Sequence, residues 1–161
     1  MTEPSRTAAP DHLRSFARSL PMALLKAREA VMMRFRPALR AHGLTEQQWR
    51  VLRAMSAADH RLRPMELAQM TFISMPSLSR LLKTLESREL VVRARHAGDQ
   101  RGAEFGLTEA GRAIVAEIAP DSERTYAEIE QLVGGADVEQ LYRVLEQVTQ
   151  RLGMPEGEGL E

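Results

Sequence analysis

The 161-residue sequence contains no cysteine. This absence excludes disulfide bonds, thiolate zinc sites, iron–sulfur clusters and cysteine-based redox sensing. Aromatic residues are scarce as well, with one Trp, two Tyr and four Phe, which argues against a sheet-rich sandwich. The many Leu, Ala, Glu, Arg and Met residues favour helices instead. The composition therefore favours a mainly α-helical protein.

Long apolar runs are missing too. No stretch reaches the roughly 20 residues that span a bilayer, and no signal-peptide core occurs near the start. We therefore expect no membrane partner and a cytoplasmic location, which the lack of cysteine also fits. Residues 1–10 should form a flexible tail. Residues 11–161 should form a single domain that ends in a second tail, residues 153–161.

Residues that could carry out catalysis or hold a cofactor are also lacking. His12, His42, His60 and His96 lie in different predicted elements, and no two of them have metal-ligand spacing. No P-loop, nucleophile elbow or glycine-rich dinucleotide motif occurs. We predict no enzymatic activity, no metal site and no cofactor.

The net charge is zero, but the charges are unevenly spread. Residues 1–62 hold 11 Lys/Arg against 5 Asp/Glu, residues 63–107 hold 7 against 5, and residues 108–161 hold 4 against 12. Such polarity permits one face toward phosphates and another turned away. The charge distribution is not evidence for phosphate binding by itself, because a run of like charges is usually only a solvated face.

Apolar residues at steps of three and four predict a long first helix that reaches about Ala41. It should start near Pro21 with Ser19 as its cap, which leaves residues 11–19 as a short arm. Thr45 and Gln48 then form a capping box for a helix over residues 45–57.

Two further long helices are predicted at the other end of the chain. Thr108 should cap the first of them, which Pro120 should kink and Gly134-Gly135 should end. The last helix has apolar residues spaced 3-4-3-4, typical of a coiled-coil seam. This seam consists of Val138, Leu141, Leu145, Val148 and Leu152.

Between these helices, Pro64 to Gly111 has the outline of a winged helix-turn-helix. A short helix, about Met65–Met70 with Leu67, Ala68 and Met70 inward, precedes a turn and a second helix from Ser74 to about Glu89. The second helix keeps its leucines on one face. Its opposite side is small, polar and basic, as a helix that enters the DNA major groove requires.

A small hairpin follows, with strands at Val91–His96 and Ala103–Leu107. The two helices alone could belong to a helical bundle, whereas a β-ribbon directly after them is what a wing requires. At its tip Arg101 could enter the DNA minor groove while Asp99 holds the arginine or the turn in place. The alternative for this pair is a surface salt bridge of little energetic value.

Several motifs together resemble the MarR family of transcription regulators. They are Glu66-Leu67-Ala68, the run from Ser77 to Glu86, Leu90-Val91-x-Arg93, Asp99-x-Arg101 and Leu107-Thr108-Glu109-Ala110-Gly111. Within that family, the segments 24–30, 35–37 and 44–50 are similar to regulators of homoprotocatechuate (hydroxyphenylacetate) degradation.

The resemblance implies a mainly α fold in which residues 11–42 and 108–152 form dimerisation helices and residues 44–107 form the DNA-binding lobe. It implies a homodimer with the second helix of each lobe in the major groove and the wing in the minor groove. The residues that it places on DNA are Ser77, Ser79, Arg80, Lys83 and Thr84 from the helix, and Arg95, Asp99 and Arg101 from the wing. The sequence departs from the family at 102–104 (Gly, Ala, Glu), where relatives often have further basic residues.

Members of the family commonly sense small phenolic or aromatic acids between the dimerisation helices and the DNA-binding lobe. Arg28 is the predicted anchor, because a guanidinium can pair bidentately with a carboxylate. Phe16, Met32, His42 and Trp49 could contact the ring, although Trp49 and Met32 also fit ordinary core positions.

The prediction is therefore a homodimeric repressor of an aromatic-acid catabolic operon. It would bind a pseudo-palindromic operator in double-stranded DNA and be released by a small phenolic or aromatic carboxylate. Two alternatives stay open: a member of the same family without a small-molecule ligand, and a helical dimerisation scaffold that does not bind DNA.

Overall fold

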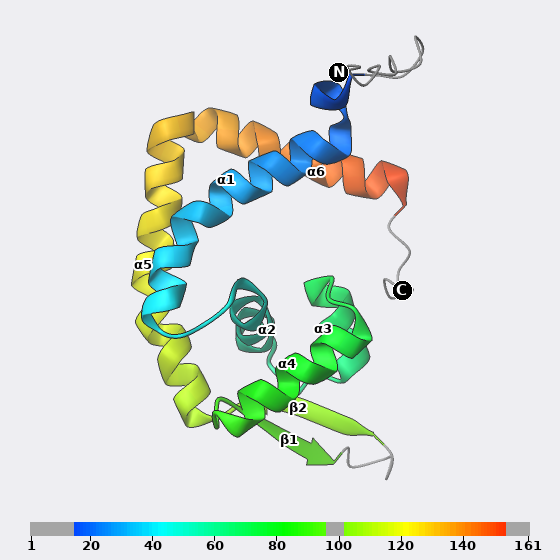
Figure 1. The fold of residues 1–161 in the computed structure, drawn as a ribbon, viewed down its shortest axis with the longest axis vertical. Helices are drawn as coiled ribbons and strands as arrows, with labels where there is room; N and C mark the ends of the chain where they lie inside the picture. Colours follow the sequence, from blue (N-terminus) through cyan, green and yellow to red (C-terminus); the bar gives the residue numbers. More distant parts are fainter. Residues whose placement is uncertain (1–14, 96–101, 154–161) are drawn as a thin grey trace, which may run out of the picture. The chain divides into compact units, whose positions relative to one another are not determined.

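A computed structural model describes residues 15–95 and 102–153 of the chain (Figure 1). The chain separates into two compact units, residues 1–34 and residues 35–161, with the division inside the first helix. The elements follow in the order η1 (Phe16–Arg18), α1 (Leu20–Ala41), α2 (Glu46–Ala57), α3 (Pro64–Thr71), α4 (Met75–Ser87), β1 (Val91–Arg95), β2 (Ala103–Leu107), α5 (Glu109–Val133) and α6 (Gly135–Leu152).

The described part of the first unit consists of η1 and the start of α1. Ser19 lies directly before α1 and its carbonyl accepts the N–H of Ala23 at 2.9 Å, so the helix starts where the sequence predicts. No side chain described in residues 15–34 is buried. The exposed ones include large apolar residues, namely Phe16, Leu20, Leu24, Leu25, Val31 and Met33.

In the second unit, α2 begins with the predicted capping box. The Thr45 hydroxyl accepts the N–H of Gln48 at 3.2 Å, and the Gln48 side-chain oxygen accepts the N–H of Thr45 at 2.9 Å. The predicted inward residues Trp49, Leu52 and Met55 are buried. α2 thus lies at the centre of the core and packs against α3, α4, α5 and β2.

The short helix α3 corrects one prediction. Leu67 and Ala68 are buried as expected, but Met70 is 48% exposed, and Thr71 is buried in its place. The reason is helical geometry, since Thr71 follows Leu67 by four residues and therefore lies on the same face. Phe72 then ends the helix in the left-handed region at φ 51°.

α4 buries Leu78, Leu82 and Leu85, and Leu81 is only half-buried. The helix ends at Ser87, two residues before the predicted end. Glu89 has a φ of 58°, and the N–H of Leu90 turns back to the carbonyl of Leu85 at 3.0 Å. This left-handed termination stops the helix without a glycine.

β1 and β2 form an antiparallel hairpin in which Arg93 pairs with Phe105 and Arg95 with Ala103. The second strand has the predicted bounds, and the predicted turn at 97–100 lies outside the described residues. Leu62 joins the hairpin, donating to and accepting from the Phe105 backbone at 2.9 and 2.8 Å. The segment before α3 is therefore fixed to the base of the wing.

α5 starts at the predicted cap, where the Thr108 hydroxyl accepts the N–H of Gly111 at 2.9 Å. The helix continues through Pro120 as one element to Val133. Gly134, with φ 101°, separates it from α6, which begins at Gly135. The glycine pair is thus a corner between two helices and not a loop.

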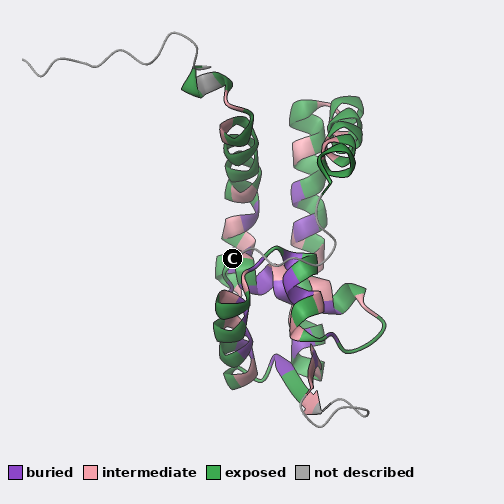
Figure 2. Cartoon of the chain, turned by 90° about the vertical axis from the view of Figure 1, so that its right-hand side faces the viewer, coloured by how far each residue is buried: buried purple, intermediate pink, exposed green. Residues whose placement is uncertain are grey.

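α6 has no buried side chain (Figure 2). Of its predicted seam, Val138, Leu145 and Val148 are half-buried, whereas Leu141 and Leu152 are 50% and 77% exposed. Exposed apolar area of this kind favours contact with a partner surface.

The architecture as a whole confirms the predicted mainly α winged helix-turn-helix fold.

Candidate nucleic-acid interface

The outward face of α4 carries the side chains predicted to enter the major groove. Ser79, Arg80, Lys83 and Thr84 are exposed, and Ser77 is half-buried. The Arg80 guanidinium donates to the Ser77 hydroxyl at 3.3 Å, and the Thr84 hydroxyl donates to the Arg80 carbonyl at 3.1 Å. These five residues therefore lie along one polar, basic side of a helix whose opposite side is buried.

The wing is described only in part. Arg95 is the last residue of β1, and its side chain lies outside the described part of the chain. Asp99 and Arg101 lie in the segment 96–101, which the structure does not describe. The predicted roles of these three residues stay predictions.

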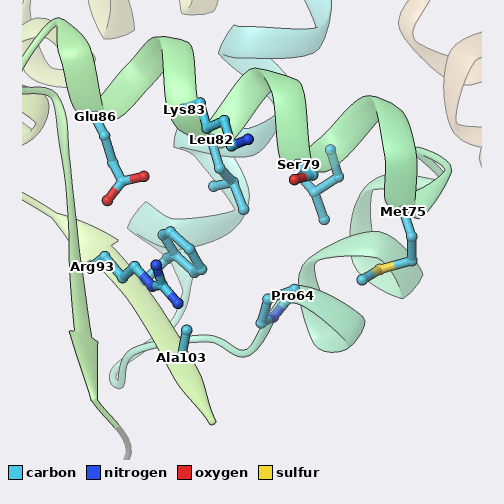
Figure 3. A pocket seen from close by; sticks show the side chains of 10 residues that line it. Pro64, Met75, Ser79, Leu82, Lys83, Glu86, Arg93 and Ala103 are labelled. Atoms are coloured by element: carbon cyan, nitrogen blue, oxygen red, sulfur yellow. The ribbon is translucent and has the colours of Figure 1, made fainter. Parts of the chain in front are cut away.

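A pocket of about 240 Å³ lies between α4 and the wing strands (Figure 3). Buried leucines of α4 and the buried Phe105 form part of its apolar lining. Its polar lining includes the charged side chains of Lys83, Glu86 and Arg93. The full lining is Pro64, Met75, Leu78, Ser79, Leu82, Lys83, Glu86, Arg93, Ala103 and Phe105.

Arg93 also lines this pocket, although the sequence prediction included it only within a family motif. It pairs with Phe105, so both side chains lie on the same face of the hairpin, and both line this pocket with Lys83. The structure thereby places a wing cation and a helix cation on the same pocket, together with the Glu86 carboxylate. Strand alternation together with the hairpin register could have revealed this.

The five predicted ligand residues are distributed over both units. In the first, Phe16 is 75% exposed in η1, Met32 is half-buried in α1, and the exposed Arg28 lies 3.9 Å from the Glu29 carboxylate. In the second, His42 is half-buried and Trp49 is 8% exposed.

Around Trp49 the structure gathers an aromatic–arginine cluster, which we define as Phe35, Trp49, Arg53 and Tyr126. The Arg53 guanidinium carbon lies 5.8 Å from the centre of the Trp49 ring. The rings of Phe35 and Tyr126 meet edge to face with centroids 5.0 Å apart. Arg53 and Tyr126 were not among the predicted ligand residues. Arg53 lies one helical turn after Trp49, and that i, i+4 spacing was the available signal.

Tyr126 remains protonated in this cluster. Burial raises the pKa of its hydroxyl above the usual value, with a further increase from Tyr142, while the positive charge of Arg53 lowers this pKa to a smaller extent. A protonated phenol donates a hydrogen bond. The cluster therefore combines a cation, a hydroxyl donor and aromatic surface, which are the groups that recognise an aromatic acid.

Within residues 15–95 and 102–153, no three His, Asp or Glu side chains are grouped so that they could hold a metal ion. In the same part of the chain, no helix has the length and apolar character needed to cross a membrane.

Comparison with known proteins identifies the family. Residues 42–102 match the MarR family. The chain is also 38% identical to the homoprotocatechuate degradative operon repressor of Escherichia coli over 129 residues, which is 80% of this chain and 86% of that protein. The chain belongs to the MarR family. Membership makes it a DNA-binding transcription regulator that acts as a homodimer, and not an enzyme.

Two solved MarR-like structures are similar over most of their length. NadR in complex with 4-hydroxyphenylacetate is 34% identical, with a TM-score of 0.72 over 84% of this chain and 96% of that chain. The repressor CouR bound to a 23-mer DNA duplex is 28% identical, with a TM-score of 0.75 over 83% and 94%.

Proposed function

We propose that this MarR-family chain represses an aromatic-acid catabolic operon and leaves its operator when a phenolic or aromatic carboxylate binds. The observation that carries the first part is α4, a helix with three buried leucines and an exposed face of Ser79, Arg80 and Lys83. A cytoplasmic location follows from this role. The proposed division of labour is a DNA-binding lobe at residues 44–107 between dimerisation helices at 11–42 and 108–152.

On DNA, α4 would lie in the major groove, with Ser77, Ser79, Arg80, Lys83 and Thr84 facing bases and phosphates. The likeness to CouR, whose structure contains a DNA duplex, supports this placement. Two recognition helices in a dimer must lie about one DNA turn apart, ~34–36 Å, to read a pseudo-palindrome. Arg93 would add a phosphate contact beside Lys83, since both cations border the same pocket.

The wing assignment predicts the effect of Arg101→Ala. We expect weaker operator binding with the fold and dimer unchanged, and a salt slope lower by about 0.9 for each phosphate that the variant no longer neutralises. Fluorescence anisotropy at several salt concentrations measures both quantities. Unchanged affinity at physiological salt would contradict the assignment of Arg101 as a DNA contact of the wing.

The proposed ligand is a small aromatic acid. The similar Escherichia coli protein is a homoprotocatechuate degradative operon repressor, and the similar NadR was solved with 4-hydroxyphenylacetate. Both names point to hydroxylated phenylacetates. The aromatic–arginine cluster suits such a molecule, because Arg53 can pair with the carboxylate and Tyr126 can donate to a ligand oxygen. The ring contacts that the sequence predicts at Phe16, Met32 and His42 stay predictions.

Two arginines compete for the role of carboxylate anchor, and a matched pair of variants separates them. Arg53→Met and Arg28→Met each remove one charge and keep a long side chain. We expect Arg53→Met to raise the dissociation constant for 4-hydroxyphenylacetate about tenfold or more, because a charged bidentate pair is removed. We expect Arg28→Met to leave it nearly unchanged.

Trp49 is the only tryptophan, so quenching of its fluorescence reports binding at the cluster directly. The neutral amide of the same phenylacetate is the ligand control and should bind weakly to every variant. If Arg28→Met loses affinity and Arg53→Met does not, the anchor lies in the first helix, as the sequence alone predicted.

A mobility-shift assay on DNA upstream of the chain's own gene tests the function as a whole. We expect a specific shift that weakens steeply with salt and is reversed by one hydroxyphenylacetate. A shift that no aromatic acid reverses would favour a MarR-family regulator without a small-molecule ligand. The absence of any specific shift would contradict the operator proposal and favour the scaffold alternative.

A further inference from the structure

The end of α4 is tied to a distant corner of the second unit by one arginine. Arg88, the first residue after α4, donates from its guanidinium to the Gly43 carbonyl at 2.8 Å and to the His42 carbonyl at 3.3 Å. These acceptors lie 45 and 46 positions earlier in the sequence. We define residues 42–44 as the α1–α2 corner.

The corner has a defined backbone conformation. The N–H groups of His42 and Leu44 both donate to the Leu39 carbonyl, at 3.2 and 2.9 Å, and the N–H of Gly43 donates to the Arg40 carbonyl at 3.0 Å. Gly43 has a φ of 62°, which suits glycine. Two consecutive carbonyls of this reversal, those of His42 and Gly43, accept hydrogen bonds from the same guanidinium.

Arg88 is equally fixed at its own end. Its N–H donates to the Thr84 carbonyl at 3.2 Å, and the next residue, Glu89, is in the left-handed region. A planar guanidinium with two donors on two acceptors restrains orientation as well as distance. A shift of the C-terminal end of α4 relative to the corner must therefore break these hydrogen bonds or change the conformation of the Arg88 side chain.

A third element reaches the same corner. The His42 ring contacts the Ala38 carbonyl through Nδ1 at 3.0 Å, and its Nε2 lies 3.7 Å from the Glu117 carboxylate of α5. The corner is thus where the ends of α1 and α4 meet α5. α4 has 13 residues and is about 20 Å long. A small tilt of the helix at its C-terminal end therefore displaces the outward, DNA-facing side chains at its other end.

We propose that Arg88 is a positioning residue for DNA binding: it holds the last turn of α4 on the α1–α2 corner and couples operator binding to the conformation of that corner. This inference rests on the proposed placement of α4 in the major groove. It does not depend on any ligand, so a failure of aromatic acids to release the operator would leave it intact.

The test compares Arg88→Ala with Arg88→Lys and with the control Arg112→Ala. Arg112 is also exposed and donates to one backbone carbonyl, that of Leu107 at 2.8 Å, but not to the corner. We expect Arg88→Ala to weaken specific operator binding about tenfold with an unchanged salt slope. Arg88→Lys should recover part of the affinity, because an ammonium can satisfy one of the carbonyls, and Arg112→Ala should bind nearly as the wild type does.

Amide hydrogen exchange at the corner is a second measurement, and its rates would not change if Arg88 made only a surface contact. In the wild type, operator binding should slow exchange of the His42, Gly43 and Leu44 amides about tenfold or more, although the corner is not among the proposed DNA contacts. In Arg88→Ala this additional protection should be absent. Should Arg88→Ala unfold, Arg88→Lys gives the same comparison.

Three results would overturn the proposal. A salt slope lower by about 0.9, with equal loss of specific and non-specific affinity, would make Arg88 a phosphate contact. Unchanged affinity and unchanged corner protection in Arg88→Ala would make its hydrogen bonds a local cap without influence on DNA binding. An equal loss of affinity in Arg112→Ala would make the loss a general effect of removing a positive charge.

Discussion

Arg80→Ala is expected to lower operator affinity by tenfold to a hundredfold, in line with the roughly 1–3 kcal/mol of a bidentate base contact. Arg80 lies at the middle of the outward face of α4, where no core packing depends on it. Its link to the Ser77 hydroxyl at 3.3 Å orients the guanidinium along the helix. The loss should therefore appear in binding and not in the free energy of unfolding.

The matched control for this variant is Arg143→Ala. Arg143 lies on α6 and donates to the Gln140 side chain three residues earlier at 2.8 Å, which repeats the local arrangement of Arg80 and Ser77. Both changes remove one positive charge. Equal losses would mean that only net charge matters.

Titration on the operator and on a scrambled duplex distinguishes the two kinds of DNA contact for Arg80. A base contact weakens specific binding selectively, whereas a phosphate contact weakens both and lowers the salt slope. Unchanged affinity on both duplexes would remove Arg80 from the interface.

Gly111→Ala is expected to lower the free energy of unfolding by about 3–5 kcal/mol, which is as large as the effect of a severe steric clash in a protein core. A Cβ at Gly111 would lie 2.0 Å from the Leu90 carbonyl oxygen and 3.0 Å from its carbon. The clash is with backbone, and Leu90 cannot easily yield, because its N–H and carbonyl are bonded to Leu85 and Thr108.

Thermal unfolding measures this effect, and for a chain of this size the melting temperature should fall by about 10 °C or more. Gly135→Ala is the control, since a Cβ there meets nothing within 4 Å at the start of α6. It should be neutral or slightly stabilising. A Gly111 variant as stable as the wild type would mean that the junction of α4, β1 and α5 is looser than the structure describes.

Local signals in the sequence were sufficient for most of the fold. Thr45 and Thr108 each provide a hydroxyl at a helix start, and both caps depend only on residues three positions away. The second strand of the wing has the predicted bounds. Such short-range rules work because the interacting groups are already adjacent in the chain.

Predictions were weaker where they concerned which face of a short helix is buried or which residues far apart in the sequence contact each other. Met70 was placed inward because it is apolar, yet Thr71 takes the buried position in a helix of only eight residues. The cluster that joins Trp49 and Arg53 to Tyr126 depends on packing between α2 and α5. No spacing rule within α1 could have pointed to Arg53 as a second candidate anchor beside Arg28.

The same limit applies to Arg88. In the sequence it is one more charged residue after a helix. Its acceptors are backbone carbonyls, which every residue type has, so the residues at 42 and 43 do not reveal that they bind an arginine. Backbone acceptors can be recognised only once both segments have been placed.

The unburied seam of α6 links the amount of this protein in the cell to its folding. An apolar helix face that a second copy covers makes subunit association part of the free energy that keeps each subunit folded. By mass action, subunits that are scarce spend more time apart and are the more readily unfolded and degraded. The level of regulator needed to occupy an operator is then set by subunit pairing as well as by affinity for DNA.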